Sequence, residues 1–487
     1  MKSHSTMSRR DFMKSIGLGS AAIASMGATA PFFHDLDEMA GIGAAETFNS
    51  TTSMQKRPWW VKEVDIPTVE IDLKLRTPYA GPSPCEGTLD SKDSIYVTKE
   101  EMAAIRASQK NNAIEGAKNN RPGFTLRDQI GAWASLDRGQ TGYLKYPPEG
   151  FRTIKVTHET LGVPKWEGSE TENAFMIRTF LRQFGAGAIG YARVDDNSVG
   201  PRKPLFNTHV RLENNPDYKY DANGTFVMPE KCKYAIVIYD RSPRDPNNYR
   251  RTVNSPQAFV SNMEKCEYGH KLQNFLWGLG YQSYWFEDST TSKFTGTPTN
   301  VWGILSGVGE YNRIHNSVSQ PEGESGNFAS ILFTDLPLPT TKPIDFGALE
   351  FCKTCGICAD VCPAGAIPTV EEYREPTWDR ATGPWSASND HKGYPNKSIE
   401  CVKWYFSYAI TGFAPSSRPV GVCRRCSSHC VFSKDHKAWI HEVVKGVVST
   451  TPVMNSFFTK MDTLSGYSDV ISDEGRAEYW HQYLPAI

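Results

Sequence analysis

The hydrophobic pattern of the chain predicts a core that mixes strands with helices. Residues 233–239 form a β-branched apolar run, KYAIVIY, with the length and composition of a buried strand. Residues 69–73 alternate apolar and polar side chains, which predicts a second, half-buried strand. Apolar positions at helical spacing predict helices at about 98–118, 170–184 and 255–279. This order of strands, loops and helices indicates a mixed α/β core that extends to about residue 340.

A glycine-rich segment follows the second predicted helix. Residues 185–190 read GAGAIG, and such small side chains suit either a tight packing turn beside a strand or a phosphate-binding loop. A lone glycine cluster is weak evidence for nucleotide binding, so we expect the packing turn.

Composition places the chain among globular proteins and argues against nucleic acid as a partner. The 487 residues are 39% hydrophobic and 22% charged, with a formal net charge of −1. Beyond the N-terminus there is no dense run of Lys and Arg, which nucleic-acid-binding proteins usually carry. No uncharged apolar stretch reaches the roughly 20 residues of a membrane-spanning helix, so we expect the mature protein not to span a membrane.

The N-terminus has the pattern of an export signal. Residues 8–14 read SRRDFMK and precede a Gly/Ala-rich stretch that ends near residue 30, which is typical of the twin-arginine route. We expect a signal peptide at 1–30, with cleavage after Ala30 or as late as Ala45. This route carries folded proteins, so the pattern predicts a cofactor that is inserted before export.

The eleven cysteines are distributed very unevenly along the chain. Eight of them lie between Cys352 and Cys430, and such crowding indicates a metal-binding module rather than a disulfide framework. The other three, Cys85, Cys232 and Cys266, are expected to be small buried hydrophobic residues.

The spacing within the cysteine module predicts two iron–sulfur clusters. The run CxxCxxCxxxCP at 352–363 has the spacing of a bacterial ferredoxin, in which the fourth cysteine binds the neighbouring cluster; a zinc site is the less favoured alternative. Next to eight cysteines, His429 is expected to support a ligand or lie at the surface rather than bind metal. The predicted ligands are Cys352, Cys355, Cys358 and Cys430 for one [4Fe–4S] cluster, and Cys362, Cys401, Cys423 and Cys426 for the other.

Further segments, taken with the twin-arginine signal, resemble the organohalide reductive dehalogenase family. These segments are KWEG at 165–168, LGY at 279–281, GVGEYNR at 307–313 and TDLPL at 334–338. FCKTC at 351–355, EPTW at 375–378 and NSFF at 455–458 look like the branch that acts on chlorinated ethenes and alkanes. The resemblance covers nearly the whole chain and implies the catalytic subunit of an organohalide-respiring enzyme.

The resemblance implies an α+β fold with two functional parts. A nitroreductase-like mixed α/β core would bind a base-off corrinoid (a cobamide), and a C-terminal ferredoxin-like module would hold the two [4Fe–4S] clusters. Electrons would pass through the clusters to a cob(I)alamin-type corrinoid, which removes chlorine from small chlorinated alkanes or alkenes. The implied divisions are the signal at 1–30, an N-terminal region at 31–160, the corrinoid-binding core at 161–340, the ferredoxin-like module at 341–440, and a C-terminal segment at 441–487 that packs on the core.

The same resemblance implies partners and a location. The substrate would be a small halogenated organic molecule, and electrons would come from a membrane electron-donor chain. The exported enzyme would sit on the outer face of the cytoplasmic membrane, attached through a small integral-membrane anchor subunit. The predicted corrinoid contacts are Leu279, Gly280, Tyr281 and Trp378.

The chain departs from the family pattern at the catalytic acid. In the family this acid is a tyrosine on the helix before LGY, and counting back from Tyr281 places Asn262 there. The nearest tyrosine, Tyr268, is shifted by six residues. The basic residue expected before TDLPL is also missing, which leaves Arg313 as the nearest downstream cation, unless it pairs with Glu310 as a structural group. Tyr268, Asn262 and Arg313 are therefore the candidate catalytic residues.

A weakened acid suggests a hypothesis about the reaction. Hydrogenolysis replaces halogen with hydrogen and needs a proton, whereas dihaloelimination of a vicinal dihalide releases two halides and needs none. We therefore expect activity such as conversion of 1,2-dichloropropane to propene, with hydrogenolysis as the other outcome.

Two other classes fit part of the pattern. An exported iron–sulfur electron-transfer subunit would share the cysteine module, but it would leave some 300 preceding residues without a role. A corrinoid tRNA-modification enzyme, epoxyqueuosine reductase, would share the cofactors, but the export signal and the absence of a basic surface argue against it.

Overall fold

The computed structural model leaves several stretches of the chain undescribed. The predicted signal at 1–30, Cys85 and Cys423 lie outside the described residues, as do the side chains of Asn262 and Cys266. The described residues are 57–76, 98–130, 154–198, 200–207, 210–214, 219–220, 225–239, 257–285, 297, 299–315, 317–319, 330–379, 390–397, 399–401, 403–404, 425–433, 439–452 and 455–464.

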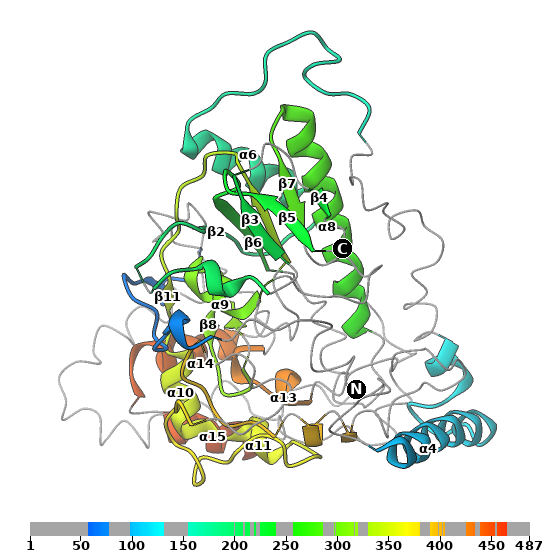
Figure 1. Cartoon of the computed structure of the whole chain (residues 1–487). Helices are drawn as coiled ribbons and strands as arrows, with labels where there is room; N and C mark the ends of the chain where they lie inside the picture. The colour runs from blue at the N-terminus through cyan, green and yellow to red at the C-terminus, as the bar shows by residue number, and fades with distance from the viewer. Residues whose placement is uncertain are drawn as a thin grey trace, which may run out of the picture.

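A four-stranded antiparallel sheet lies at the centre of one half of the molecule (Figure 1). Its strands follow the order β2 (Ile189–Arg193), β6 (Tyr234–Ile238), β10 (Ser330–Thr334) and β7 (Ser283–Trp285). The predicted strand at 233–239 is confirmed as β6, which pairs with β2 on one side and β10 on the other.

Both faces of this sheet are covered, which explains why β6 is apolar at every position. Ala235 and Val237 belong to one buried cluster, whereas Ile236 and Ile238 belong to another. Successive side chains of a strand point to opposite faces, so a strand buried on both sides reads as a continuous apolar run.

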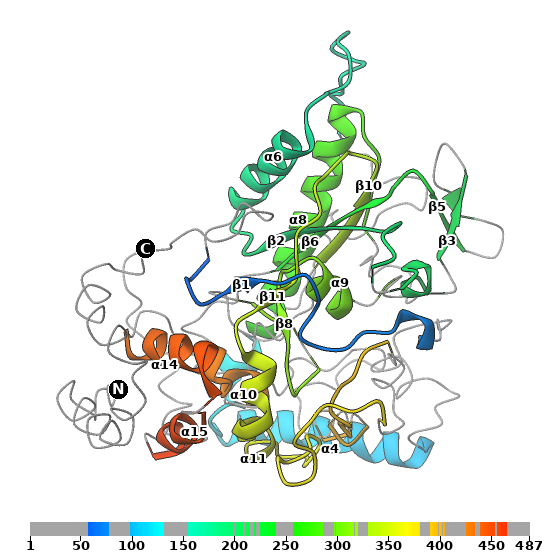
Figure 2. The ribbon, with the colours of Figure 1, turned by 90° about the vertical axis from the view of Figure 1, so that its left-hand side faces the viewer.

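Two helices cover the face that carries Ile236 and Ile238. They are α6 (Glu170–Arg182) and α8 (Gln257–Leu279), which confirm the helices predicted at 170–184 and 255–279 (Figure 2). A capping box at Ser169 begins α6, because the serine and Glu172 side chains each accept a backbone N–H of the other residue. The first predicted helix is confirmed as α4 (Lys99–Lys118), with the same type of cap at Thr98.

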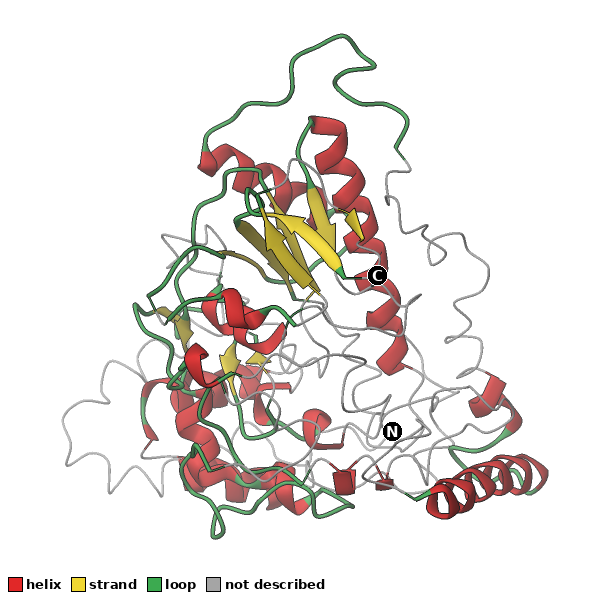
Figure 3. Ribbon diagram, in the orientation of Figure 1, coloured by secondary structure: helices red, strands yellow, loops and turns green. Residues whose placement is uncertain are grey.

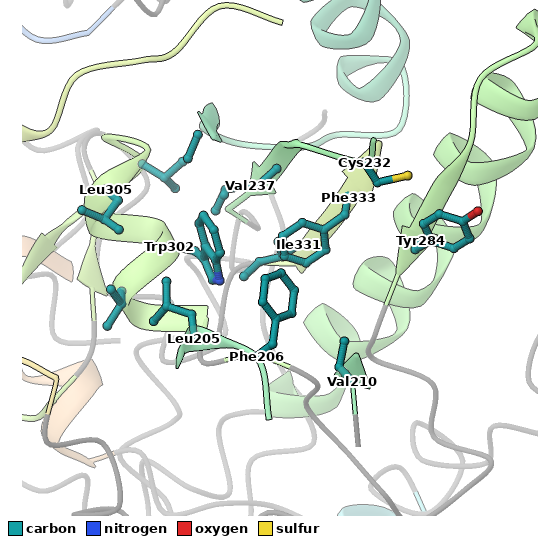
Figure 4. Close-up of a cluster of buried hydrophobic side chains, with 14 of the residues drawn as sticks. Leu205, Phe206, Val210, Cys232, Val237, Tyr284, Trp302, Leu305, Ile331 and Phe333 are labelled. Atoms are coloured by element: carbon teal, nitrogen blue, oxygen red, sulfur yellow. The ribbon is translucent and has the colours of Figure 1, made fainter. Parts of the chain in front are cut away.

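The opposite face packs against α9 (Thr299–Leu305) and a small second sheet. Trp302 of α9 is fully buried and meets both Phe206 and Phe333 edge-on, and these two phenylalanine rings are tilted relative to each other (Figure 4). Cys232 lies in the same cluster with 1% of its surface exposed, as predicted for a small buried hydrophobic residue. The second sheet has the order β3 (Val210–Glu213), β5 (Phe226–Pro229) and β4 (Lys219–Tyr220).

The predicted strand at 69–73 is wrong. Only Ile71 makes a β-bridge there, to His391, and the chain then enters the 3-10 turn η2 (Leu73–Leu75). The Asp72 carboxylate accepts the N–H of Lys74, so a local cap ends the extended conformation. The glycine-rich turn is confirmed: Gly185 has a φ of +88°, and β2 starts shortly after it.

The cysteine-bearing helices form the other end of the molecule (Figures 1 and 3). One apolar cluster there joins Trp60, Phe346, Phe351, Phe432 and Phe458, which come from distant parts of the chain. The remaining elements are β1 (Lys62–Glu63), η3 (Lys203–Leu205), β8 (Glu310–Tyr311), β9 (Ser317–Val318), β11 (Ile344–Asp345), α10 (Ala348–Cys355), α11 (Ile357–Asp360), α13 (Arg425–Ser428), η5 (Val431–Ser433), α14 (Trp439–Thr450) and α15 (Asn455–Leu464).

The described architecture is therefore a mixed α/β fold with a helical, cysteine-rich end. Within the described part of the chain, no helix combines the length and apolar character needed to cross a bilayer.

Candidate functional site

Helix α10, which carries the first two cysteines of the run, begins at a buried carboxylate. Its N-cap residue is Gly347, which has no side chain to offer. Glu310 of β8 takes that place: its oxygens accept the N–H groups of Phe346, Ala348 and Leu349 at 2.9–3.1 Å. Burial raises the pKa of Glu310 to about 7, although these backbone hydrogen bonds lower it. Glu310 thus fixes where the cysteine helix starts.

A glycine turn sets the spacing of the next cysteines. Cys352 and Cys355 lie on α10, and Gly356, with a φ of +71°, turns the chain into α11, which carries Cys358. Only glycine adopts this left-handed conformation readily. Cys362 follows α11, and its sulfur accepts the N–H of Ala366 at 3.3 Å. A backbone N–H directed at sulfur stabilises a thiolate, as expected of a cluster ligand.

Packing brings the two halves of the cysteine set together. Cys355 and Cys430 both pack against the cluster that contains Phe432. Cys358, Cys362 and Cys426 instead pack against the cluster of Ile314, Ala359 and Ile367. The crossed ligand sets predicted from the sequence pair Cys355 with Cys430 and Cys362 with Cys426, and each of these pairs shares an apolar cluster. The packing also places Cys358, predicted as a ligand of the first iron–sulfur cluster, with Cys362 and Cys426, so the division of ligands stays a prediction.

The thiols of the run lie within electrostatic range of one another. Burial raises the pKa of Cys352 to about 11 and that of Cys358 well above its ordinary value. The neighbouring thiols of Cys352, Cys355 and Cys426 raise the pKa of Cys358 further. Thiolates crowded in this way need bound cations, so the chemistry of the donor set fits iron–sulfur clusters.

Among the described residues, no three His, Cys, Asp or Glu side chains converge on the position of a single metal ion. A tetrahedral zinc site would need sulfur atoms only about 4 Å apart. The thiolates of a cubane each bind a different iron and surround a larger group.

Arg313 lies beside this run rather than beside Glu310. Its guanidinium donates to the carbonyl oxygen of Cys352 at 2.8 and 3.1 Å. It also donates to the carbonyl oxygens of Pro368, Thr369 and Tyr373. The predicted pairing with Glu310 is wrong, because the Glu310 oxygens accept other donors; the alternative of a structural role, however, agrees with these contacts.

The segment at 390–397 covers the same region. Tyr394 is fully buried beneath Arg313, with the guanidinium carbon 4.0 Å from the ring centroid. Asp390 forms a buried ion pair with Arg76 at 3.3 Å, and its other oxygen contacts the His391 ring at 2.6 Å. These contacts tie the chain near residue 76 to the segment that packs against the cysteine run.

His429 is buried, so its predicted place at the surface is wrong. Its Nδ1 contacts the carbonyl oxygen of Arg425 at 2.7 Å, within the helical turn that carries Cys426. This position agrees with the alternative that His429 supports neighbouring cysteines.

Two of the candidate catalytic residues, Tyr268 and Arg313, lie in different parts of the described structure. Tyr268 lies in the apolar cluster between α6, α8 and the sheet, with 2% of its surface exposed. Its hydroxyl lies 3.7 Å from where a Cβ on Gly185 would be. Asn262 belongs to α8, and Arg313 lies at the cysteine-bearing end. Tyr268 and Arg313 are therefore not brought together, and the catalytic role of all three residues stays a prediction.

The LGY segment forms the far end of α8, away from the cysteine helices (Figures 1 and 2). The Tyr281 hydroxyl donates to the carbonyl oxygen of Trp166 at 2.7 Å, and the Leu279 carbonyl accepts the Trp166 N–H at 3.0 Å. Gly280 has a φ of +98°, and a Cβ there would overlap Lys165. These contacts describe a turn that ends the helix. The other predicted corrinoid contact, Trp378, is half-buried in the segment after the cysteine run.

Sequence reasoning missed the supporting roles of Glu310, Tyr394 and Asp390. Glu310 and Arg313 belong to the GVGEYNR segment at 307–313. That motif drew attention to these residues but gave no indication of which residues they contact. Their contacts are made to residues at least 36 positions away, so local spacing held no signal for them.

Comparison with known proteins shows that this mixed α/β chain with its cysteine-rich end is similar to reductive dehalogenases. A family model described as reductive dehalogenase subunit matches residues 56–210. The chloroethene reductive dehalogenase of Dehalococcoides mccartyi strain VS is 27% identical, over 99% of this chain and 98% of that one. The tetrachloroethene reductive dehalogenase of Sulfurospirillum multivorans is 30% identical over 60% of this chain and 56% of that one.

The class is that of oxidoreductases acting on carbon–halogen bonds. The chain is similar over 99% of its length to two proteins named as reductive dehalogenases.

Solved structures support the fold. The catabolic reductive dehalogenase NpRdhA matches with a TM-score of 0.55 at 17% identity, over 86% of this chain. The match spans 50% of that longer chain. A second matching structure, with a TM-score of 0.54 and 16% identity, carries a title that describes B12-dependent dehalogenation. At this level of identity the likeness establishes the shared fold.

Proposed function

We propose that this chain is the catalytic subunit of a reductive dehalogenase that removes chlorine from small chlorinated alkanes or alkenes. The observation that carries the proposal is the similarity, across 99% of this chain and 98% of the relative, to a protein named as a chloroethene reductive dehalogenase. The cysteines that lie close together in the described structure support the proposal, because they could bind the iron–sulfur clusters that the reaction needs.

The cofactors of the proposal are a base-off corrinoid and two [4Fe–4S] clusters. The corrinoid is supported by the matching structure whose title describes B12-dependent dehalogenation. The clusters are supported by the ferredoxin spacing and by the crowded thiols around Cys358. When bound, the corrinoid supplies a strongly reducing cobalt centre, and the clusters deliver electrons to it. The proposed site for the corrinoid is a nitroreductase-like core, and that for the clusters is a ferredoxin-like module.

The surroundings of Tyr268 favour elimination over hydrogenolysis. A tyrosine that donates a proton leaves a phenolate, and the apolar cluster around Tyr268 disfavours a buried charge. Dihaloelimination needs no proton. We therefore propose vicinal dihaloalkanes as preferred substrates.

The test is product analysis with protein reconstituted with iron, sulfide and a cobamide, and reduced by viologen. With 1,2-dichloropropane the expected products are propene and two chloride ions per molecule. A predominantly monochloropropane product would remove the elimination proposal but keep the dehalogenase. Absence of chloride release from chlorinated ethenes and alkanes alike would remove both.

Export and membrane attachment complete the proposal. The twin-arginine pattern supports a location on the outer face of the cytoplasmic membrane, with a small integral-membrane anchor subunit and a membrane electron-donor chain as partners. The two other classes, an electron-transfer subunit and an epoxyqueuosine reductase, receive no support from the relatives, which are named as dehalogenases.

A further inference from the structure

Arg313 is held by backbone oxygens alone. Its side chain has 1% of its surface exposed, and its five hydrogen bonds, at 2.8–3.3 Å, all end on peptide carbonyls. Two of them go to Cys352, on α10, and the other three go to residues 368–373, beyond the cysteine run. The guanidinium therefore bridges the first cysteine and the loop that follows the last cysteine of the run.

No carboxylate pairs with this guanidinium among the described residues. The nearest acid in the sequence, Glu310, directs its oxygens to the start of α10 and to the hydroxyl of Thr68. Carbonyl oxygens and the ring of Tyr394 are partial negative charges, whereas a fully buried cation is normally balanced by an anion. Within the described part of the chain, the charge of Arg313 is therefore not balanced by a carboxylate.

The thiols of Cys352 and Cys358 lie within electrostatic range of Arg313. The positive charge of Arg313 lowers the pKa of both Cys352 and Cys358, against the effect of burial. A [4Fe–4S] cluster with four thiolate ligands carries net negative charge, and it gains one further negative charge on reduction. A fixed cation beside such a cluster therefore stabilises the reduced form more than the oxidised form.

We propose that Arg313 is a positioning residue whose charge is balanced by the cluster bound through Cys352, and that it raises the reduction potential of that cluster. The inference rests on the proposed function, because it requires the two clusters. The step concerned is the transfer of one electron from a low-potential one-electron donor, which is oxidised, to the cluster, which is reduced. Arg313 stays protonated throughout and exchanges no proton.

The test compares Arg313→Gln and Arg313→Lys with the wild type in potentiometric titrations followed by electron paramagnetic resonance. At the wild-type midpoint of the affected cluster, Arg313→Gln should lower the ratio of reduced to oxidised cluster about tenfold, equivalent to about 59 mV for one electron. Arg313→Lys keeps the charge and should change this ratio less than threefold. The other cluster should keep its midpoint in both variants. Arg193→Gln, which removes an exposed arginine paired with Asp195, is the matched control.

The outcomes separate the two proposals. Wild-type protein that assembles no iron–sulfur cluster would overturn the proposed function itself. Clusters present in Arg313→Gln with unchanged midpoints would overturn the role of Arg313 and leave the proposed function standing. If Arg313→Gln fails to assemble clusters, the measurement is made on Arg313→Lys. A tenfold fall in the ratio of reduced to oxidised cluster in that variant, which retains the charge, would contradict the proposal.

Discussion

The Glu310 side chain alone provides the cap at the start of α10. Its carboxylate takes the place of an N-cap for α10, although it lies 38 residues before Ala348 in the sequence. Because it is fully buried, the charged form is disfavoured by desolvation and favoured by the hydrogen bonds, and its pKa of about 7 reflects both.

The titration of Glu310 predicts a pH dependence of stability. Its pKa is about 7 in the folded chain and about 4.5 in the unfolded chain, so the folded state binds more protons between these values. The free energy of unfolding should therefore fall as pH rises from 4.5 through 7, by about 3 kcal/mol from this group. Melting curves of wild type and Glu310→Gln between pH 5 and 8 check this, because the variant should lack this part of the slope.

The control for this measurement is Glu172→Gln in the capping box of α6. The pKa of Glu172 lies below its ordinary value, because backbone and side-chain hydrogen bonds from Ser169 stabilise its charge. The Glu172 variant should keep the wild-type pH slope in this window. The same slope in Glu310→Gln as in the wild type would contradict the account.

At the scale of elements, patterns that use local contacts were predictable. The helices α4, α6 and α8 and the strand β6 follow from periodicity and caps, because the information lies within a few residues of each element. The segment at 69–73 was not predictable in the same way, since one side chain, Asp72, caps a turn and overrides the alternation.

Gly307 tests the packing between elements. It follows α9 with a φ of +64°, and a Cβ there would overlap the carbonyl oxygen of Lys342. Gly307→Ala should therefore lower the free energy of unfolding by at least about 3 kcal/mol, from the left-handed backbone and the overlap together. Denaturant unfolding measures this difference.

Gly162 is the matched control, because it has a φ of +69° but no atom within 4 Å of a built Cβ. Gly162→Ala should lower the free energy of unfolding by only about 1 kcal/mol, the effect of the backbone conformation. Equal effects at the two positions would show that the contact with Lys342 is not as described.

At the scale of the whole molecule, the grouping of the described cysteines at one end was predictable, because most of them are close in sequence. The residues that surround them were not predictable. Arg313, Tyr394 and Asp390 reach the cysteine run through folding, and no spacing rule connects them to it. Tyr268 and the LGY segment have catalytic and cofactor roles predicted from their place in the sequence, and these roles stay predictions. Their described contacts are with an apolar cluster and with Trp166.

Removal of a cysteine tests the assignment of clusters. Cys430→Ala should lower bound iron from about eight to about four per chain, because one cubane loses a ligand while the other keeps four. Cys232→Ala, which removes a buried cysteine outside the module, should keep the wild-type iron content. Iron analysis of both reconstituted proteins checks this, and equal iron in the two variants would argue against Cys430 as a ligand.

The central claim is that this one chain holds both a corrinoid and two iron–sulfur clusters. The most direct measurement is the iron and cobalt content of wild-type protein after reconstitution with iron, sulfide and a cobamide and removal of unbound cofactor. We expect about eight iron atoms and about one cobalt atom per chain. Protein that binds the iron but no cobalt, or that binds neither, would contradict it.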